Sequence, residues 1–167
     1  MTQGDLELLL LQQVGALERI ARAEGARLHH IKLHGALYHA SEADSALGRG
    51  YVNAVRRWWP RCIIYAKAGG SVAKLARRSG LKVWEEAFAD RAYRADGSLQ
   101  PRGEPGAVLS DGEEVLRRVR LLRSHGEILS DSITLLRLRP QTLCLHSDTP
   151  QAVELAQVIA RDLQSEG

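Results

Sequence analysis

The sequence predicts an α/β fold, in which the strands of a parallel sheet alternate with helices. Short apolar runs of strand length recur at residues 27–34, 61–68, 82–89 and 141–146. Segments with apolar residues at helical spacing separate these runs, and glycine or proline marks most of their ends. The length of 167 residues is enough for one domain with its own core, so we expect a single domain over residues 1–167.

The first two helices and the first strand are predicted from spacing and stop signals. Residues 4–24 carry leucine, valine and alanine at helical intervals, and Gly25 is a suitable end. Residues 27–34 are the first strand. The next helix covers about residues 44–59, because Pro60 forces the residue before it out of the helical region.

The middle of the chain repeats this order. Residues 61–68 are the second strand, and a glycine turn leads to Ser71, which is predicted to cap the following helix. That helix runs to about residue 79, where Gly80 suits a helix end. Residues 82–89 are the third strand.

The stretch of residues 85–108 begins as the end of the third strand and continues as a long loop, which is dense in Asp, Arg, Tyr, Gly and Pro. Asp96-Gly97 predicts a tight turn, because glycine adopts the positive φ that such turns need. Long loops within a compact domain are usually functional or disordered. Aromatic residues among paired charges favour an ordered binding loop here.

The last third of the chain contains two helices and one principal strand. Residues 111–125 form a helix capped by its first residue, and 133–138 are a short extra strand or hairpin arm. Residues 141–146 are the fourth principal strand. The last helix covers 148–164, with Pro150 at its first helical position.

Composition excludes several classes of protein. The formal net charge is only +3 and arginines are mixed with acids, so nucleic-acid binding is not expected. No apolar run is long enough to cross a membrane. The two cysteines, Cys62 and Cys144, are predicted to be reduced thiols of a cytoplasmic protein. All three tryptophans are expected in the core: Trp58, Trp59 and Trp84.

Polar side chains gather where the predicted strands end. In parallel α/β folds, ligands bind at the carboxyl ends of the strands. Four strands place reactive residue types there: Lys32 and His34; Gly69, Gly70 and Ser71; Glu86 and Asp90; His146 and Asp148.

Each of these groups has a structural alternative. The amides of Gly69, Gly70 and Ser71 suit a carboxylate or phosphate, but an ordinary capped turn has the same sequence. Lys32 and His34 are two residues apart, so in a strand they point to the same side. Their role there is either structural or catalytic.

The carboxylates are equally open to two interpretations. Glu86 and Asp90 form an acid–base pair, or Asp90 braces the loop through Arg91 or Arg94. His146 is oriented by Asp148, or Asp148 is the N-cap of the last helix.

Four segments together resemble the LamB/YcsF family, which is the family of the 5-oxoprolinase A subunit. They are IKLHGALYHA (31–40), KAGGSVAKLARRSGL (67–81), EEAFADRAYRADGSLQPRGEPGAVLSD (85–111) and LCLHSDTPQAV (143–153). The FADRAY segment is the longest and most specific. Leu33, His39 and Ser147 depart from the family pattern, which has Pro, Asn and Gly there.

The resemblance implies a fold, a reaction and a set of residues. The fold is a distorted TIM-like β/α barrel, here partial. The reaction is the ATP-dependent hydrolysis of 5-oxoproline (pyroglutamate) to glutamate, an amide-ring hydrolysis carried out with partner subunits B and C that handle ATP. We expect catalytic roles for His34, Glu86, Asp90, His146 and Asp148, and substrate-binding roles for Lys32, Gly69, Gly70, Ser71, Arg91, Tyr93 and Arg102.

The family's DLNCDLGE-like, ACGFHAGD-like and GAHP-like segments are not in this sequence, so we expect a truncated member. Four principal strands cannot close a barrel of about eight. The edge of the strand at 27–34 is then expected to be covered by the first helix, by a second copy in a homo-oligomer or by a partner chain. The alternative function is a non-catalytic small-molecule-binding or scaffold subunit. No metal site is assigned, although a metal-dependent hydrolase is a weaker third possibility by fold analogy.

Overall fold

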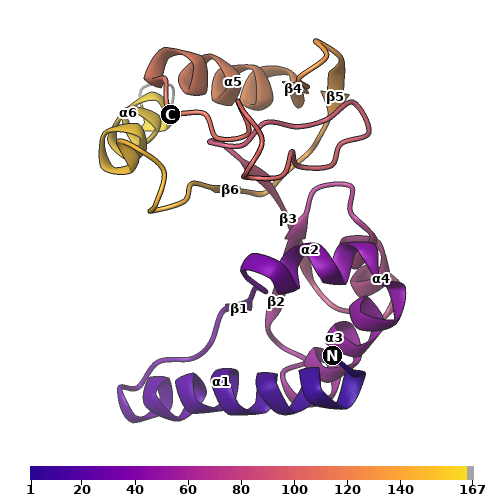
Figure 1. The fold of residues 1–167 in the computed structure, drawn as a ribbon. Coiled ribbons are helices and arrows are strands. Elements are labelled where there is room, and N and C mark those ends of the chain that lie inside the picture. Colours follow the sequence, from indigo (N-terminus) through magenta and orange to yellow (C-terminus); the bar gives the residue numbers. More distant parts are fainter. Residues whose placement is uncertain (165–167) are drawn as a thin grey trace. The chain divides into compact units, whose positions relative to one another are not determined.

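The computed structural model describes residues 1–164 (Figure 1). The chain divides into two compact units, the first covering residues 1–85 and the second beginning at Glu86. Strand β3 (Val83–Phe88) passes from the first unit into the second. The expectation of a single domain stays a prediction.

Helices and strands alternate along the chain. The helices are α1 (Gln3–Ala23), α2 (Gly35–Ala43), α3 (Ser45–Trp58), α4 (Ser71–Arg78), α5 (Gly112–His125) and α6 (Ala152–Gln164). The remaining strands are β1 (His30–Ile31), β2 (Ile63–Lys67), β4 (Glu127–Leu129), β5 (Leu135–Arg137) and β6 (Thr142–Cys144).

The principal sheet has the strand order β1-β2-β3-β6. β1 pairs with β2 in parallel, and β3 pairs with β6 in parallel, with Phe88 opposite Cys144. The predicted α/β class, with parallel strands that alternate with helices, is confirmed. Strands β4 and β5 form a separate antiparallel pair. The predicted hairpin arm at 133–138 is therefore confirmed, whereas its partner β4 was not predicted.

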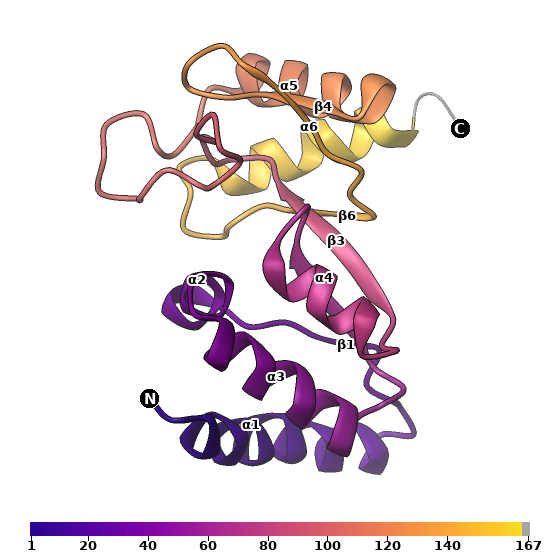
Figure 2. The ribbon, with the colours of Figure 1, turned by 90° about the vertical axis from the view of Figure 1, so that its right-hand side faces the viewer.

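The first unit is built on the packing of α1 against α3, which lie side by side in Figure 2. Tyr51 and Val55 of α3 and Ile64 of β2 are almost completely buried. Full burial of an apolar side chain contributes about 1.5–3 kcal/mol, so residues of this kind hold the unit together. The hydroxyl of Tyr51 also donates a hydrogen bond to the carbonyl oxygen of Ile31, at 3.0 Å, which ties α3 to β1.

Two predicted elements of the first unit differ from the structure. The first strand covers only His30–Ile31 instead of 27–34. Residues 35–43, which were expected to be a connection, form α2, and α3 follows directly because Asp44 caps it through the amides of Ala46 and Leu47. The helix predicted from about residue 44 to residue 59 is therefore confirmed as α3, whereas α2 was not predicted.

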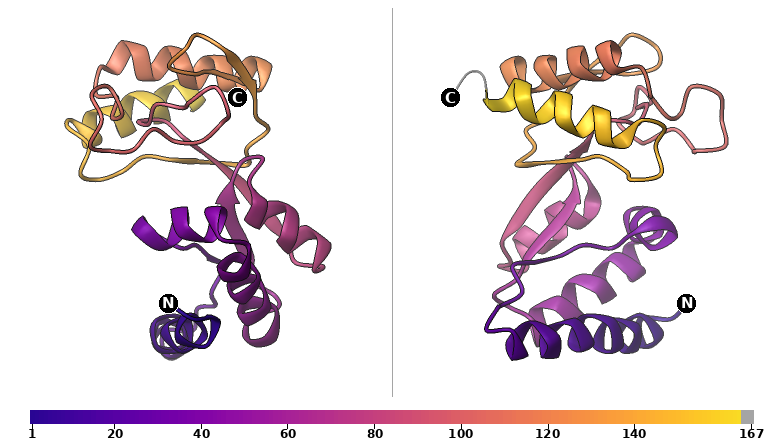
Figure 3. Two further views of the ribbon diagram at one scale, coloured as in Figure 1. Left: turned by 45° about the vertical axis from the view of Figure 1, so that its right-hand side comes forward. Right: turned by 90° about the vertical axis from the view of Figure 1, so that its left-hand side faces the viewer.

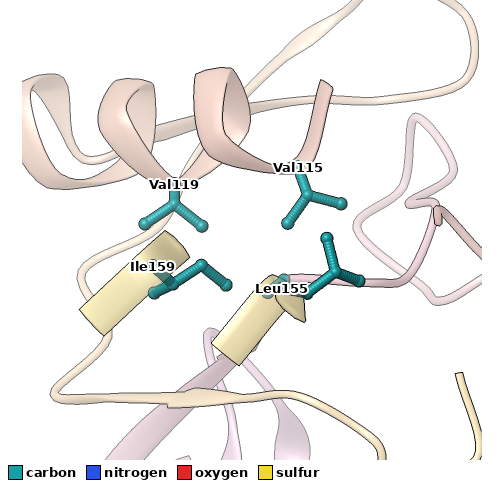
Figure 4. Packing of buried hydrophobic residues seen from close by; sticks show 5 residues of the cluster. Val115, Val119, Leu155 and Ile159 are labelled. Atoms are coloured by element: carbon teal, nitrogen blue, oxygen red, sulfur yellow. The ribbon is translucent and has the colours of Figure 1, made fainter. Parts of the chain in front are cut away.

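The second unit is built on α5 and α6, which lie side by side in both views of Figure 3. Val115 and Val119 of α5 point toward Leu155 and Ile159 of α6 (Figure 4). Ala89, just after β3, is buried in the same cluster. This core therefore supports the segment that follows β3, where candidate site residues lie.

The predicted start of the last helix and the placement of two tryptophans were wrong. Helix α6 begins at Ala152, so Pro150 is not its first residue. Trp59 is buried as expected, but Trp58 and Trp84 are exposed. Trp58 Nε1 donates a hydrogen bond to Glu7 of α1 at 2.6 Å, so this side chain lies at the rim between α1 and α3 and not in the core.

The loop over residues 85–108 is ordered by its own hydrogen bonds. Gly97 has φ of 78° and its amide donates to the carbonyl oxygen of Arg94, so the predicted turn is confirmed. The amide of Ala92 donates to the carbonyl oxygen of Ala107 at 3.0 Å, and the amide of Leu109 to that of Asp90 at 2.9 Å. The loop thus folds back on itself and is anchored beside Asp90.

No helix within residues 1–164 has both the length and the apolar character needed to cross a membrane.

Candidate functional site

The centre of the candidate site is a contact between Asp90 and His146. Parallel pairing of β3 with β6 places the residues that follow both strands at one edge of the sheet. His146 Nδ1 lies 3.0 Å from both carboxylate oxygens of Asp90, and the His146 amide donates to Asp90 Oδ2 at 3.0 Å. The Thr149 hydroxyl also donates to Oδ2. Asp90 is thus completely buried and accepts three hydrogen bonds.

The Asp90–His146 contact fixes the chemistry of the imidazole. An ionised carboxylate only accepts hydrogen bonds, so Nδ1 carries the proton and donates it to Asp90. In the neutral ring, Nε2 then has the lone pair. The side chain of His146 is 28% exposed, and its ring stacks on that of Phe88 with centroids 5.6 Å apart. The structure therefore presents a half-exposed base whose orientation is set by a buried acid.

Asp148 does not orient His146, and this expectation is corrected. Its carboxylate forms two hydrogen bonds with Arg102, Nη1 to Oδ2 and Nη2 to Oδ1, the second at 3.0 Å. The hydrogen bond from Arg102 holds the pKa of Asp148 below its ordinary value. Asp148 is not the N-cap of α6 either, because that helix begins only at Ala152.

Two predicted substrate-binding residues of the loop, Arg91 and Tyr93, are buried and serve the fold. Arg91 donates to the carbonyl oxygens of Gln100 and Ala107, and burial lowers its pKa. The Tyr93 hydroxyl accepts a hydrogen bond from the amide of Phe88 at 3.0 Å, and burial raises the pKa of Tyr93. The predicted bracing of the loop by Asp90 is replaced by another ion pair, in which Arg94 contacts Glu104 at 2.7 Å.

Glu86 is buried on β3. Burial is the main cause that raises the pKa of Tyr93, and the charge of Glu86 acts in the same direction. The structure pairs Asp90 with His146, and the role of Glu86 as an acid or base stays a prediction.

The remaining predicted site residues belong to the first unit. His34 is exposed and precedes α2 without a side-chain cap, and Lys32 Nζ lies 5.9 Å from the ring centroid of Tyr38. Their roles stay predictions. The amide of Gly69 donates to Glu85 Oε2 at 2.8 Å, so this amide is already satisfied within the chain.

The anion position predicted at Ser71 is filled by the chain's own Glu42. Its carboxylate accepts the amide of Ser71 at 2.6 Å and the Ser71 hydroxyl at 3.0 Å. Gly70, not Ser71, is the N-cap, and a Cβ on Gly70 would lie 2.6 Å from a Glu42 oxygen. The glycine is therefore required for the approach of Glu42, and the turn is a capped turn in this structure.

Sequence reasoning missed the roles of Glu42, Thr149 and Phe88. Thr149 stands in the HSDTP segment, three residues after His146, and it matches the family pattern there, but its hydrogen bond to Asp90 was not predicted. Glu42 lies 29 residues before Ser71 at the end of a helix that was not predicted. Phe88 was predicted only as a residue of the third strand.

Among residues 1–164, no three His, Cys, Asp or Glu side chains are grouped closely enough to hold a metal ion.

Comparison with known proteins gives a consistent result. The LamB/YcsF family matches residues 1–167. A 5-oxoprolinase A subunit from Heliobacterium modesticaldum is 42% identical over 95% of this chain and 63% of its own length. One from Pyrococcus furiosus is 40% identical over 100% of this chain and 66% of its own length.

A solved structure also matches. The lactam utilization protein from Thermus thermophilus has a TM-score of 0.90 and 34% identity, over 99% of this chain and 66% of that protein. The chain thus spans about two thirds of the length of these relatives. By the extent of these matches, the chain belongs to the LamB/YcsF family.

Proposed function

We propose that this chain takes part in the ATP-dependent hydrolysis of 5-oxoproline to glutamate, as an A subunit that acts with partner subunits B and C. The names of the relatives, which are 5-oxoprolinase A subunits and a lactam utilization protein, support the substrate class. The observation that carries the proposal is the buried Asp90 that holds His146 Nδ1, because this arrangement makes Nε2 a base.

Lactam hydrolysis requires a water molecule to attack the ring carbonyl carbon. In the proposed reaction His146 Nε2 takes a proton from that water as the new C–O bond forms. The imidazolium that results is stabilised by the ionised Asp90. The same proton then passes to the ring nitrogen as the C–N bond breaks, which leaves the open-chain amine and a carboxylic acid. The acid then gives its proton to the amine, so the products are an ammonium group and a carboxylate.

ATP belongs to the proposed reaction through the partner subunits. The one helix N-terminus predicted as an anion site in this chain is filled by Glu42, and the sequence has no phosphate-binding loop. These residues do not fit a phosphate group, so we derive no step of this chain through ATP.

The assembly and location are further parts of the proposal. We expect partner subunits, and a homo-oligomer is compatible with the edge of β1. Two free thiols, Cys62 and Cys144, agree with a cytoplasmic location, which stays a prediction. A binding or scaffold subunit without activity is the alternative that the following experiment separates.

The test is glutamate release by the reconstituted assembly with wild-type and His146→Gln chains. Removal of a general base lowers rates by roughly 10²- to 10⁴-fold. His125→Gln is the matched control, because His125 is exposed at the end of α5, where its Nδ1 contacts the hydroxyl of the neighbouring Ser124.

Near-UV circular dichroism and a thermal shift with 5-oxoproline verify that the His146→Gln chain is folded and still binds. If this folded variant releases glutamate at the wild-type rate, His146 is not the base. Binding of 5-oxoproline by the wild-type chain without any glutamate release by the assembly favours the alternative of a non-catalytic binding protein.

A further inference from the structure

The ion pair between Arg102 and Asp148 connects two segments that border His146. Arg102 lies in the loop after β3, and Asp148 lies two residues beyond His146, after β6. Both terminal nitrogens of Arg102 contact the carboxylate, one oxygen each. This is the two-pronged geometry with which a guanidinium binds a free carboxylate.

The pair is exposed, in contrast to the neighbouring polar contacts. The side chain of Arg102 is 40% exposed and that of Asp148 is 66% exposed, whereas Asp90 is completely buried. Exposed ion pairs contribute little to the free energy of unfolding. A ligand carboxylate can therefore take the place of Asp148 at small cost.

Arg102 also differs from the other arginines of its loop. Arg91 is buried and donates to two main-chain carbonyl groups, and Arg94 is paired with Glu104. The hydrogen bond to Asp148 raises the pKa of Arg102, and the negative charges of Asp148 and Asp90 act in the same direction. Its hydrogen bonds to Asp148 place the guanidinium beside the segment that carries His146, two residues before Asp148.

We propose that Arg102 is the receptor for the carboxylate of the substrate, and that Asp148 is an internal stand-in which the substrate displaces. This inference rests on the proposed function, in which the ligand is a lactam bearing a carboxylate and His146 is the base. It assigns Asp148 a competing role instead of a catalytic one. The substrate ring is thereby oriented by its carboxylate, while the lactam carbonyl is left for His146.

The experiment compares two ligands that differ in the carboxylate alone. 5-Oxoproline and 2-pyrrolidone share the lactam ring, and their affinities are measured by NMR titration of the full chain. In Asp148→Asn, Arg102 has lost its charged competitor, so the affinity for 5-oxoproline rises about three- to fivefold. The affinity for 2-pyrrolidone stays unchanged.

Arg102→Gln gives the opposite result. The affinity for 5-oxoproline falls at least about tenfold, because a charge-assisted, two-pronged contact is lost. The preference for 5-oxoproline over 2-pyrrolidone disappears with it. Glu104→Gln is the matched control, since it removes another exposed ion pair of the same loop and leaves both affinities unchanged.

Two outcomes overturn the inference: an unchanged or weaker affinity of Asp148→Asn for 5-oxoproline, or an unchanged ligand preference of Arg102→Gln. Asp148→Ser is measured alongside, so that one poorly folded variant does not decide the result. Acetate separates this inference from the proposed function. If the lactam is the wrong substrate, Asp148→Asn still binds acetate more tightly than wild type, while the assembly releases no glutamate.

Discussion

In each unit a carboxylate binds groups of the segment that follows a sheet strand, and the two carboxylates have different roles. Glu42 in the first unit accepts the amide and the hydroxyl of Ser71 at the start of α4. Asp90 in the second unit accepts the imidazole of His146 and the hydroxyl of Thr149. Glu42 thus caps the first turn of a helix, whereas Asp90 determines which nitrogen of the His146 imidazole carries the proton.

The comparison shows that a polar residue at a strand end is not by itself a functional residue. What separates the two carboxylates is the partner. A main-chain amide has no reactive state to control, so Glu42 contributes to stability. An imidazole can gain and lose a proton, and the Nε2 atom of His146 is not held by Asp90. We therefore expect Asp90 to contribute to the reaction.

The largest effect is expected from Asp90→Asn. The amide side chain can donate as well as accept, so it no longer enforces the Nδ1–H tautomer of His146. We expect glutamate release to fall roughly 10³- to 10⁴-fold in the reconstituted assembly, by analogy with acids that orient a catalytic histidine. Asp96→Asn, in the turn of the same loop, is the control and retains activity. A rate within about tenfold of wild type would remove Asp90 from the mechanism.

Glu42→Ala tests the other half of the comparison. The first turn of α4 loses its acceptor, and the free energy of unfolding falls by about 1–2 kcal/mol, as for other helix caps. Urea denaturation measures this loss. The rate of glutamate release per folded molecule stays at the wild-type level. A large drop in that rate with unchanged stability would reverse the roles assigned to the two carboxylates.

Tyr93→Phe is expected to have a smaller effect on stability. The substitution removes the acceptor of the Phe88 amide, and a hydrogen bond of this kind contributes about 1 kcal/mol. The ring of Phe88 stacks on the imidazole of His146. The hydrogen bond between Tyr93 and Phe88 therefore also helps to hold the site in place. Thermal unfolding followed by circular dichroism measures the loss, and an unfolding midpoint equal to that of wild type contradicts it.

The smallest effect concerns Asp148. Its folded-state pKa lies below the ordinary value of 3.8 because Arg102 donates to it. The ion pair therefore stabilises the fold above the unfolded pKa, and this contribution is lost as the pH falls through the folded pKa. An NMR titration of the carboxyl carbon gives a midpoint below 3.8 in wild type. In Arg102→Gln the midpoint returns toward that ordinary value, and equal midpoints in both proteins argue against the ion pair.

Sequence patterns predicted the fold class and the location of most site candidates, because strand ends are visible in apolar runs and glycine turns. They did not reveal that Asp90 and His146 meet. That contact depends on β3 and β6 being neighbours, and local sequence carries no information on which strands pair. The family resemblance indicated the same residues without indicating their partner.

The inward-facing side chains of the loop were equally unpredictable. Arg91 and Tyr93 belong to the most recognisable motif of the chain, and a loop has no periodicity that separates its inner from its outer residues. Both are in fact buried supports of that loop. Glu42 was missed for a related reason, since its partner Ser71 is 29 residues away and a helix break lies between the two.

The complete burial of Asp90 has a consequence for strand register. A buried carboxylate without partners is strongly unfavourable, and its partners here come from residues 56 and 59 positions further along the chain. A slip of β6 by one residue against β3 would turn His146 to the other face of the sheet and leave the charge unpaired. The contact between Asp90 and His146 therefore favours the correct register of β3 and β6. The same contact orients the proposed base, so register and reactivity depend on one interaction.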